Sequence, residues 1–489
     1  MAVDKGLCRS GDAMTRLATS SHRMLDGNSA PMTILADRLT DNRRRVLAWF
    51  QDDVFRRLFV NAGKLLSANV VGAVLGLIAA VLTARALGPQ DYGILALVLV
   101  YQLTVGKLVT FDAWQAVIKF GSEALHADDR AGLRQLVKFG FALDIASALV
   151  GMALAMALAG PVIGLLGWDA SVRPLVVLYS VLILFSLSGT PIGVLRLFDR
   201  FDLLSYTAIL SGVVRLAGVA WCLLTNQRLF GFVLVYLITG IVGQLYQVFA
   251  SLWVLRKQNV TGVINEPLRG IRRRFPGIAD YVWTTNLTMT VRMLSREADG
   301  LFIAALTTPA ALGLFKVAKQ FAGVLPRFSD PLSQSIYPEL ARAWAARDAG
   351  RFVSLIKRTT LFTAAAAFGG WFVFLLAGRW IIRWTVGPAY QDAYWVTVFY
   401  LLALVIFLCS FALTPSLLAM GLARRSLVSN VAATAVYFGL LFPAIRYFGV
   451  VGASLAYVGF FAVWSGIMVF FLRTHLNEQG AAVDAAERS

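Results

Sequence analysis

The chain has 489 residues, of which 58% are hydrophobic and only 15% are charged, and its formal net charge is +18. A water-soluble protein could not bury that much apolar surface, and several windows of about 20 residues carry almost no charge. The basic residues lie mostly in short segments between apolar runs, which is typical of topology signals and not of a nucleic-acid-binding surface. We therefore predict an all-α integral membrane protein with no nucleic-acid partner.

The chemistry-bearing side chains exclude several function classes. The three cysteines are far apart, and all three histidines fall outside the apolar runs. This pattern contains neither a disulfide framework nor the spacing of a zinc site. A Walker motif is also absent, so direct use of ATP is not expected. We predict no cofactor, no metal and no catalytic residue.

The N-terminal segment precedes the first long apolar run, and no signal peptide is evident in it. Residues 1–42 are polar without hydrophobic periodicity, and we expect a disordered cytoplasmic tail. Residues 43–60 combine five arginines with apolar residues at helical spacing, which indicates a basic amphipathic helix on the membrane surface. An unstructured basic anchor is the alternative interpretation. The apolar positions are Leu47, Phe50, Val54 and Leu58.

Twelve apolar runs are each long enough to cross a hydrocarbon core of about 30 Å at 1.5 Å per residue. The longest connection, residues 256–279, contains two prolines and divides the runs into six and six. We predict an N-terminal six-helix bundle over 61–255, a C-terminal six-helix bundle over 280–472 and a cytoplasmic tail over 473–489. The expected spans are 62–85, 92–117, 139–160, 174–195, 204–224, 230–255, 280–305, 311–336, 359–378, 393–419, 426–446 and 450–472.

The distribution of basic residues predicts the orientation. With the N-terminus inside, the inner segments hold thirty-two Lys and Arg residues and the outer segments hold six. An excess of this size on one side is a strong positive-inside signal. Both termini are therefore predicted to be cytoplasmic.

The two halves contain a weak internal repeat. Pro89 and Gly93 follow the first expected span, and Pro309 and Gly313 follow the seventh at the same spacing. A shift of 220 residues also places Lys107 on Arg327. Because six spans are an even number, the halves enter the membrane from the same side, and a repeat would be related by an axis along the membrane normal.

Seven cations lie inside the expected spans. Charges this deep normally face a water-filled cavity or a partner, and those from several spans suggest one shared cavity between the halves. Arginine binds two phosphate oxygens at once and lysine acts as a point charge, so the surplus of cations indicates an anionic substrate. The predicted binding residues are Lys107, Arg215, Arg292, Arg296, Lys316, Lys319 and Arg327.

Four acids accompany these cations, and they cannot neutralise all seven. Each acid has two interpretations: it is a fixed partner of a nearby cation, or it takes up a coupling proton or sodium ion. We favour the fixed ion pair. The acids are Asp112, Glu297, Asp299 and Asp330.

Four stretches resemble the polysaccharide transporter family, the Wzx-type lipid-linked oligosaccharide flippases of the MATE-like MOP exporter superfamily. The resemblance covers nearly everything from residue 59 to residue 472. It implies two six-helix bundles around a central cavity, a polyprenyl-pyrophosphate-linked glycan as substrate and alternating access. The stretches are RALGPQDYGILAL (85–97), DGLFIAALTTPAALGLFKVAKQF (299–321), SLLAMGLARRSL (416–427) and FGVVGASLAYV (448–458).

The sequence thus predicts a flippase in the bacterial cytoplasmic membrane that moves a lipid-linked glycan outward for cell-surface polysaccharide biosynthesis. Its expected partners are that glycolipid, membrane lipid, and the polymerase and glycosyltransferases of the same pathway. The alternative is a MATE-type ion-coupled exporter of small molecules, which ranks lower because a cavity for cationic drugs should be acidic. An enzyme is disfavoured because no span contains histidine and the longest outer segment has only about fifteen residues.

Overall fold

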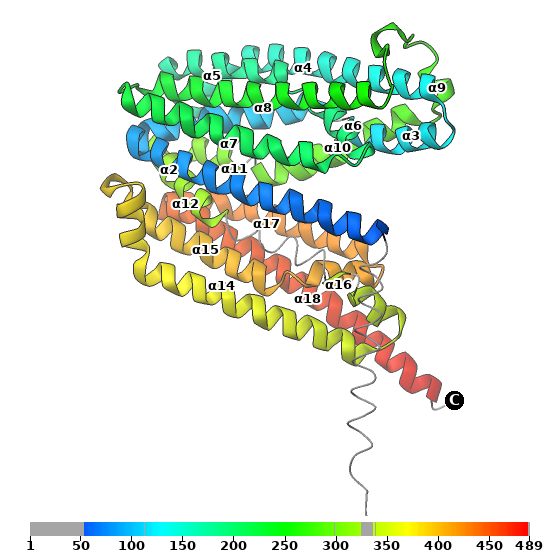
Figure 1. Cartoon of the computed structure of the whole chain (residues 1–489). Coiled ribbons are helices and arrows are strands. Elements are labelled where there is room, and N and C mark those ends of the chain that lie inside the picture. Colours follow the sequence, from blue (N-terminus) through cyan, green and yellow to red (C-terminus); the bar gives the residue numbers. More distant parts are fainter. Residues whose placement is uncertain (1–52, 112, 298, 324–335, 338, 488–489) are drawn as a thin grey trace, which may run out of the picture. The chain divides into compact units, whose positions relative to one another are not determined.

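The computed structural model describes residues 53–487 except 112, 298, 324–335 and 338. In this part of the chain all regular structure is helical (Figure 1), which confirms the predicted all-α fold. Helices suit a membrane span because every backbone polar group is bonded within the segment. The chain forms two compact units, residues 1–64 and 65–489. Of the first unit, the structure describes the opening turns of helix α2 (Asp53–Val109).

Nine helices in the described ranges are long and apolar enough to cross a membrane. One of them, 70–109, covers most of the first two expected spans, which are joined at a kink where Gly88 has a φ of 72° and Pro89 follows. Glycine adopts this left-handed conformation without steric cost. Ten of the twelve expected spans therefore coincide with these nine helices. The other two, 280–305 and 311–336, fall on α10, α11 and α12 and partly outside the described residues.

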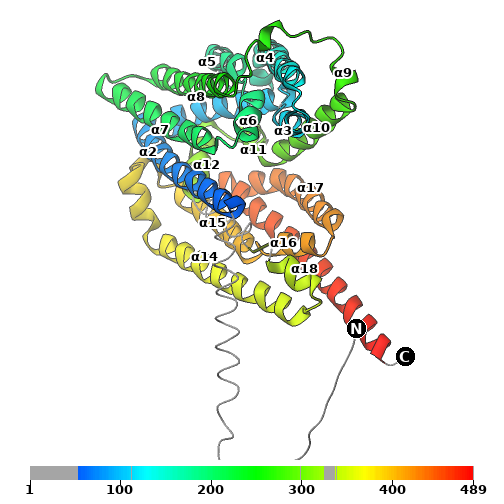
Figure 2. The same cartoon turned by 45° about the vertical axis from the view of Figure 1, so that its right-hand side comes forward.

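We call residues 65–257 the first half. Its helices pack on one another (Figures 1 and 2). Helix α4 lies against α5, and α7 lies along α8. The helices after α2 are α3 (Trp114–His126), α4 (Arg130–Leu166), η1 (Ala170–Val172), α5 (Arg173–Ser180), η2 (Val181–Phe185), α6 (Gly189–Leu197), α7 (Phe201–Leu224) and α8 (Leu229–Lys257).

A linker with two short helices leads to the second half, residues 278–478, where α18 packs against both α15 and α17. The linker helices are η3 (Val263–Asn265) and α9 (Ile271–Arg274). Those that follow are α10 (Ile278–Glu297), α11 (Asp299–Leu306), α12 (Pro309–Ala322), α14 (Ala349–Thr385), η4 (Pro388–Tyr390), α15 (Ala393–Cys409), α16 (Leu413–Ala419), α17 (Ala423–Phe448) and α18 (Val450–Glu487).

Two expected spans are interrupted. The second was predicted to run unbroken over 92–117, but α2 ends at Val109 and α3 begins at Trp114. The fourth was predicted to run over 174–195, but residues 186–188 between η2 and α6 are not helical. Neither break was predicted from the sequence. Two polar side chains on α4, described below, accept hydrogen bonds from backbone amides freed at these breaks.

The core is organised differently at the two ends of the helices. Toward the end that the charge distribution places outside, a single cluster joins residues of both halves, including Tyr92, Phe315 and Tyr390. Toward the inner end the described core residues form separate clusters. One contains Phe120 of the first half, and the other contains Phe352 of the second. The Phe120 cluster also includes Ile278 and Val282 of α10, so on the inner side the first half shares a core with α10 but, among the described residues, not with α14 to α18.

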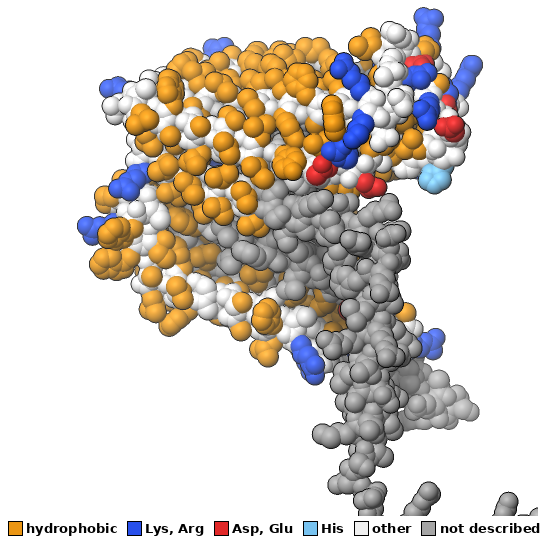
Figure 3. Space-filling view, viewed as in Figure 1, with side chains coloured by type: hydrophobic (Ala, Val, Ile, Leu, Met, Phe, Trp, Pro, Cys, Tyr) orange, Lys and Arg blue, Asp and Glu red, His pale blue; other side chains and the backbone are white. Residues whose placement is uncertain are grey.

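Hydrophobic side chains cover most of the face shown in Figure 3, as expected for a surface in contact with lipid. Lysine and arginine side chains gather at the ends of the helices, with more of them where α3 and α9 lie. This arrangement keeps the charged groups at the level of water and lipid headgroups.

Candidate functional site

One face of α2 runs along the second half of the chain. Residues seven apart on a helix lie on nearly the same face, and three such residues of α2 each contact the second half. A Cβ atom built on Gly93 would lie 1.7 Å from the carbonyl oxygen of Pro309, and one built on Gly300 would lie 2.8 Å from Val100. In order toward the inner end, the three contacts are Gly93 with α12, Val100 with α11 and Lys107 with α10.

Lys107 is the predicted binding residue that lies on this face. It is half-buried in the last turn of α2, about 27 Å from the kink at Pro89 by helical rise. Its carbonyl oxygen accepts a long hydrogen bond of 3.4 Å from the Thr290 hydroxyl on α10. Thr290 precedes Arg292 by two residues. The structure therefore brings Lys107 beside the helix that carries two other predicted cations.

The remaining predicted residues lie on several elements. Lys316 and Lys319 are half-buried on α12, and Arg215 is half-buried on α7. The backbones of Arg292, Arg296 and Glu297 lie on α10, and Asp299 begins α11. The side chains of these four residues are outside the described part of the structure, as are Asp112, Arg327 and Asp330 entirely. Their convergence on one cavity stays a prediction.

The outer end of the contact between the halves is built from two repeated motifs. Gly93 approaches Pro309, and a Cβ atom on Gly313 would in turn lie 2.3 Å from the carbonyl oxygen of Pro89. Each glycine thus accommodates the backbone of the other motif, as in an interface with two-fold symmetry. The two motifs whose Pro and Gly spacing suggested a repeat therefore contact each other.

Aromatic side chains reinforce this outer contact. The rings of Tyr92 and Tyr390 meet edge to face with centroids 6.3 Å apart. The Tyr390 hydroxyl donates to the carbonyl oxygen of Ala84 at 2.8 Å, and the Trp168 indole Nε1 donates to that of Ala304 at 2.9 Å. Each of these three contacts joins the first half to the second. We call the whole set, with the two glycine contacts, the outer seam.

Arg215 packs inside the first half instead. Its guanidinium carbon lies 4.8 Å from the centre of the Tyr236 ring, and its Nε is buried without a hydrogen-bond partner. No carboxylate of the described residues forms an ion pair with it. An arginine at the centre of a membrane helix costs about 2.5–3.5 kcal/mol on insertion scales. A desolvated cation–π contact returns about 2 kcal/mol, so the cation is not fully compensated.

Asp144 is a buried acid that our sequence analysis did not identify. It is 1% exposed on α4, about 9 Å beyond Lys138 by helical rise. Its Oδ2 accepts a hydrogen bond of 2.7 Å from the backbone amide of Thr190, in the first turn of α6. A carboxylate at this place accepts a hydrogen bond from a free backbone amide in the first turn of a helix, and its negative charge is stabilised by the helix dipole. The signal in the sequence is a single acid within the apolar run of α4.

A second side chain of α4 serves the other interrupted span. The Ser147 hydroxyl accepts a hydrogen bond of 3.1 Å from the amide of Phe111, between α2 and α3. Asp144 and Ser147 are three residues apart and therefore lie on one face of α4. Inside a membrane, backbone amides freed by a break must find such partners. One helix therefore supports both breaks.

The linker between the halves is fixed to the inner end of α4. The Arg134 guanidinium forms an ion pair with Glu266 at 2.6 Å, and the Lys138 ammonium donates to two linker carbonyl oxygens. The Arg274 guanidinium binds the carboxylate of Asp129. It holds the pKa of Asp129 below its ordinary value, and the amide of Gly132 adds to this effect. The linker is thus part of the first half.

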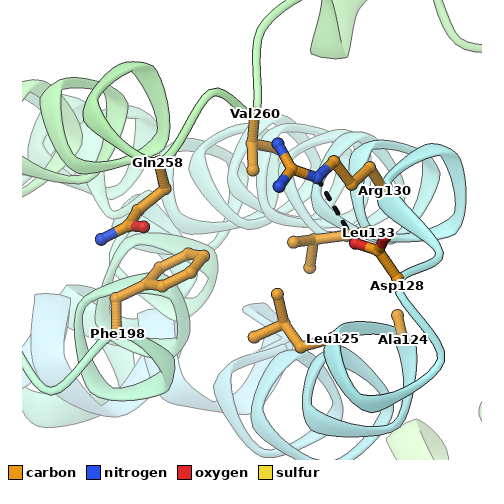
Figure 4. A pocket seen from close by; sticks show the side chains of 8 residues that line it. All are labelled: Ala124, Leu125, Asp128, Arg130, Leu133, Phe198, Gln258 and Val260. Atoms are coloured by element: carbon orange, nitrogen blue, oxygen red, sulfur yellow. Dashed lines mark ion pairs between the residues drawn. The ribbon is translucent and has the colours of Figure 1, made fainter.

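A small pocket lies at the same inner end, among α3, α4, α6 and α8 (Figure 4). Its volume is about 100 Å³, whereas ligand sites usually measure about 300–1,000 Å³. Its charged residues, Asp128 and Arg130, form an ion pair at 3.6 Å. The pocket is too small for a glycan, and we do not assign it to the functional site. Its lining is Ala124, Leu125, Asp128, Arg130, Leu133, Phe198, Gln258 and Val260.

Known proteins resemble this chain in both sequence and fold. It is 33% identical over 300 residues to the inner membrane protein YghQ of Escherichia coli strain K12, which covers 60% of this chain and 83% of that protein. A multidrug resistance MATE family transporter of the MOP superfamily, solved in an inward-facing conformation, superposes with a TM-score of 0.65. It has 14% identity and covers 85% of this chain and 98% of its own.

The lipid II flippase MurJ in an inward closed conformation also gives a TM-score of 0.65, with 16% identity over 84% of this chain and 87% of its own. At these identities the solved structures establish the fold alone. A model of the family described as polysaccharide biosynthesis protein matches residues 58–344, which is more than half of the chain. The chain therefore belongs to the polysaccharide biosynthesis protein family and has the all-helical fold of the MATE-like transporters.

Proposed function

We propose that the chain is a flippase of the bacterial inner membrane. It moves a polyprenyl-pyrophosphate-linked oligosaccharide from the inner to the outer leaflet by alternating access, for the biosynthesis of a cell-surface polysaccharide. Glycosyltransferases of the same pathway supply this substrate, and a polymerase consumes it. Family membership and the resemblance to YghQ support this proposal.

The observation that carries the proposal is the position of Lys107 beside α10. The Lys107 backbone accepts a hydrogen bond from Thr290 on α10, so this cation of the first half lies beside the helix of the second half that carries Arg292 and Arg296. Pyrophosphate is a dense anion, and such cations suit its recognition. The outer seam, and the inner cluster of the second half that contains no residue of the first, support entry of the substrate from the cytoplasmic side.

The membrane potential is a sufficient driving force for this direction. Each negative charge that moves outward gains about 2.3 kcal/mol per 100 mV when the inside is negative. A pyrophosphate that crosses with about two charges would gain about twice that amount. Coupling to a proton or sodium ion would add to a step that is already favourable.

A MATE-type exporter of small cations is the second candidate, and the superposition on a multidrug transporter favours it. The charges argue against it. Lys107 and the cations predicted on α10 would repel a cationic drug, whereas they would attract a pyrophosphate.

The test is a flipping assay in proteoliposomes with an inside-negative potential and a fluorescent polyprenyl-pyrophosphate oligosaccharide. We expect Lys107→Gln to slow flipping at least about tenfold, and Lys107→Arg to retain part of the rate. Arg446→Gln removes a cation from the exposed last turn of α17 and is the matched control. Wild-type protein that exports ethidium along an ion gradient but does not move the glycolipid would overturn the proposal.

A further inference from the structure

Arg215 lies against one buried tyrosine and near two others. Besides the contact with the Tyr236 ring at 4.8 Å, its charge lies within electrostatic range of the hydroxyls of Tyr92 and Tyr179. All three tyrosines are buried, with 4–6% of each exposed. Phenolic hydroxyls and guanidinium groups both donate hydrogen bonds to oxyanions. We call these four residues the tyrosine cage.

The cage holds a positive charge that its surroundings do not balance. The described residues provide no carboxylate partner for Arg215, and its buried Nε donates no hydrogen bond. A buried polar group left in this state requires an explanation, such as a bound water or ion. A structural arginine would normally be neutralised by an acid, so an anionic ligand is the simpler explanation.

The cage also lies at a different depth from Lys107. By helical rise, Arg215 lies about 14 Å from the outer end of α7 at Leu224, whereas Lys107 lies about 27 Å from the outer kink of α2. The separation in depth is thus roughly 13 Å. Tyr92 connects the cage to the outer seam, because its ring contacts Tyr390 of the second half.

We propose that the tyrosine cage is a second oxyanion site, on the outer side of the first half, which binds a phosphoryl group. Under the proposed function, the pyrophosphate binds at the cage after it leaves the depth of Lys107. Because Tyr92 belongs to both the cage and the outer seam, an anion at Arg215 lies next to the contacts that must open for release. This role rests on the proposed function, whereas binding of the anion does not.

The test measures binding of inorganic pyrophosphate to the full chain in nanodiscs, by calorimetry and by the shift of the thermal unfolding midpoint. The variants are Arg215→Met, Arg215→Lys and Tyr236→Leu, each also made in a Lys107→Gln background that weakens the inner site. We expect Arg215→Met to weaken the remaining binding at least about tenfold, which corresponds to the loss of one charged hydrogen-bonding partner. Arg446→Gln is the control. Parallel binding measurements with phosphate, acetate and chloride identify which anion the cage prefers.

Thermal unfolding without ligand separates a binding role from a structural role. Removal of an unbalanced buried charge should leave the midpoint of Arg215→Met unchanged or raise it. A lowered midpoint, or pyrophosphate binding equal to that of the Lys107→Gln parent, would overturn the second site. If pyrophosphate binding depends on Arg215 but no glycolipid is flipped, the cage stands and the proposed function falls. If Lys107→Gln abolishes flipping and Arg215→Met does not, the proposed function is supported and the role of the cage in transport is overturned.

Discussion

Gly93 and Gly313 occupy equivalent places in the two halves, and each accommodates the backbone that precedes the other. A Cβ atom on Gly93 would lie 1.7 Å from the oxygen of Pro309, and one on Gly313 would lie 2.3 Å from that of Pro89. Real atoms do not approach so closely, so neither helix can carry a side chain here while the outer seam is closed. The approach of two backbones explains why both motifs contain glycine.

We predict that Gly93→Ala prevents normal closure of the outer seam. Overpacking of a tight contact costs about 1–3 kcal/mol, enough to shift an equilibrium between two conformations by about fivefold or more. The measurement is labelling by a membrane-impermeant maleimide, added outside, of a cysteine introduced at the buried Ala304, whose hydrogen bond in the outer seam is made by its backbone oxygen. Gly76→Ala lies on the same helix with no atom near its Cβ position and is the control. Unchanged labelling in Gly93→Ala would show that the seam does not gate the outer side.

The deep cations give a second prediction. Arg292→Ala and Arg327→Ala should abolish glycan export while the protein still inserts, because each removes a charge that we assign to the pyrophosphate. Lysine at either position should keep partial activity if charge alone matters. Export in a deletion strain, with expression measured in the same cells, tests this prediction. Normal export by both alanine variants would show that these two cations do not bind the pyrophosphate.

Asp144 leads to a third prediction. Asp144→Asn keeps an oxygen that can accept from the Thr190 amide, so we expect it to retain fold and activity. Asp144→Ala leaves that buried amide without its acceptor, which costs about 1–3 kcal/mol and should lower the unfolding midpoint. Asp169 accepts from the Ser171 amide at 2.7 Å in an exposed loop, so Asp169→Ala should cost less. Loss of transport by Asp144→Asn at unchanged stability would instead assign the carboxyl group a role in ion coupling.

The fold was largely predictable because length, hydropathy and charge constrain a membrane helix strongly. The two interrupted spans were not predictable. The residues VLILFSLSGTP (181–191) include two serines, a glycine and a proline, but membrane helices often contain such residues, so they do not by themselves place a break at 186–188. The break depends on Asp144, which is distant in the sequence and supplies the acceptor that the freed amide needs. Likewise, the spacing of Pro and Gly predicted a repeat, but it did not predict that the two copies contact each other.

The last prediction concerns the fixed linker. Because Arg274 lowers the folded-state pKa of Asp129, their pair contributes stability above the unfolded-state value of about 3.9. That contribution is fully present above about pH 5 and is lost as the pH falls through the lowered folded-state value. Both side chains are partly exposed, so we expect at most about 1 kcal/mol.

The measurement is the rate at which an acid-stable protease cleaves residues 258–277 at a series of pH values. We expect wild-type protection to fall between about pH 5 and pH 3, and Arg274→Gln to be cleaved faster at pH 7 with a flatter pH profile. Arg273→Gln removes a neighbouring exposed cation for which no ion pair is present among the described residues, and it should behave as wild type. Equal cleavage of all three proteins at pH 7 would mean that the linker is held by its other contacts to α4. Those contacts are the ion pair of Arg134 with Glu266 and the hydrogen bonds from Gln135 and Lys138 to linker carbonyl oxygens.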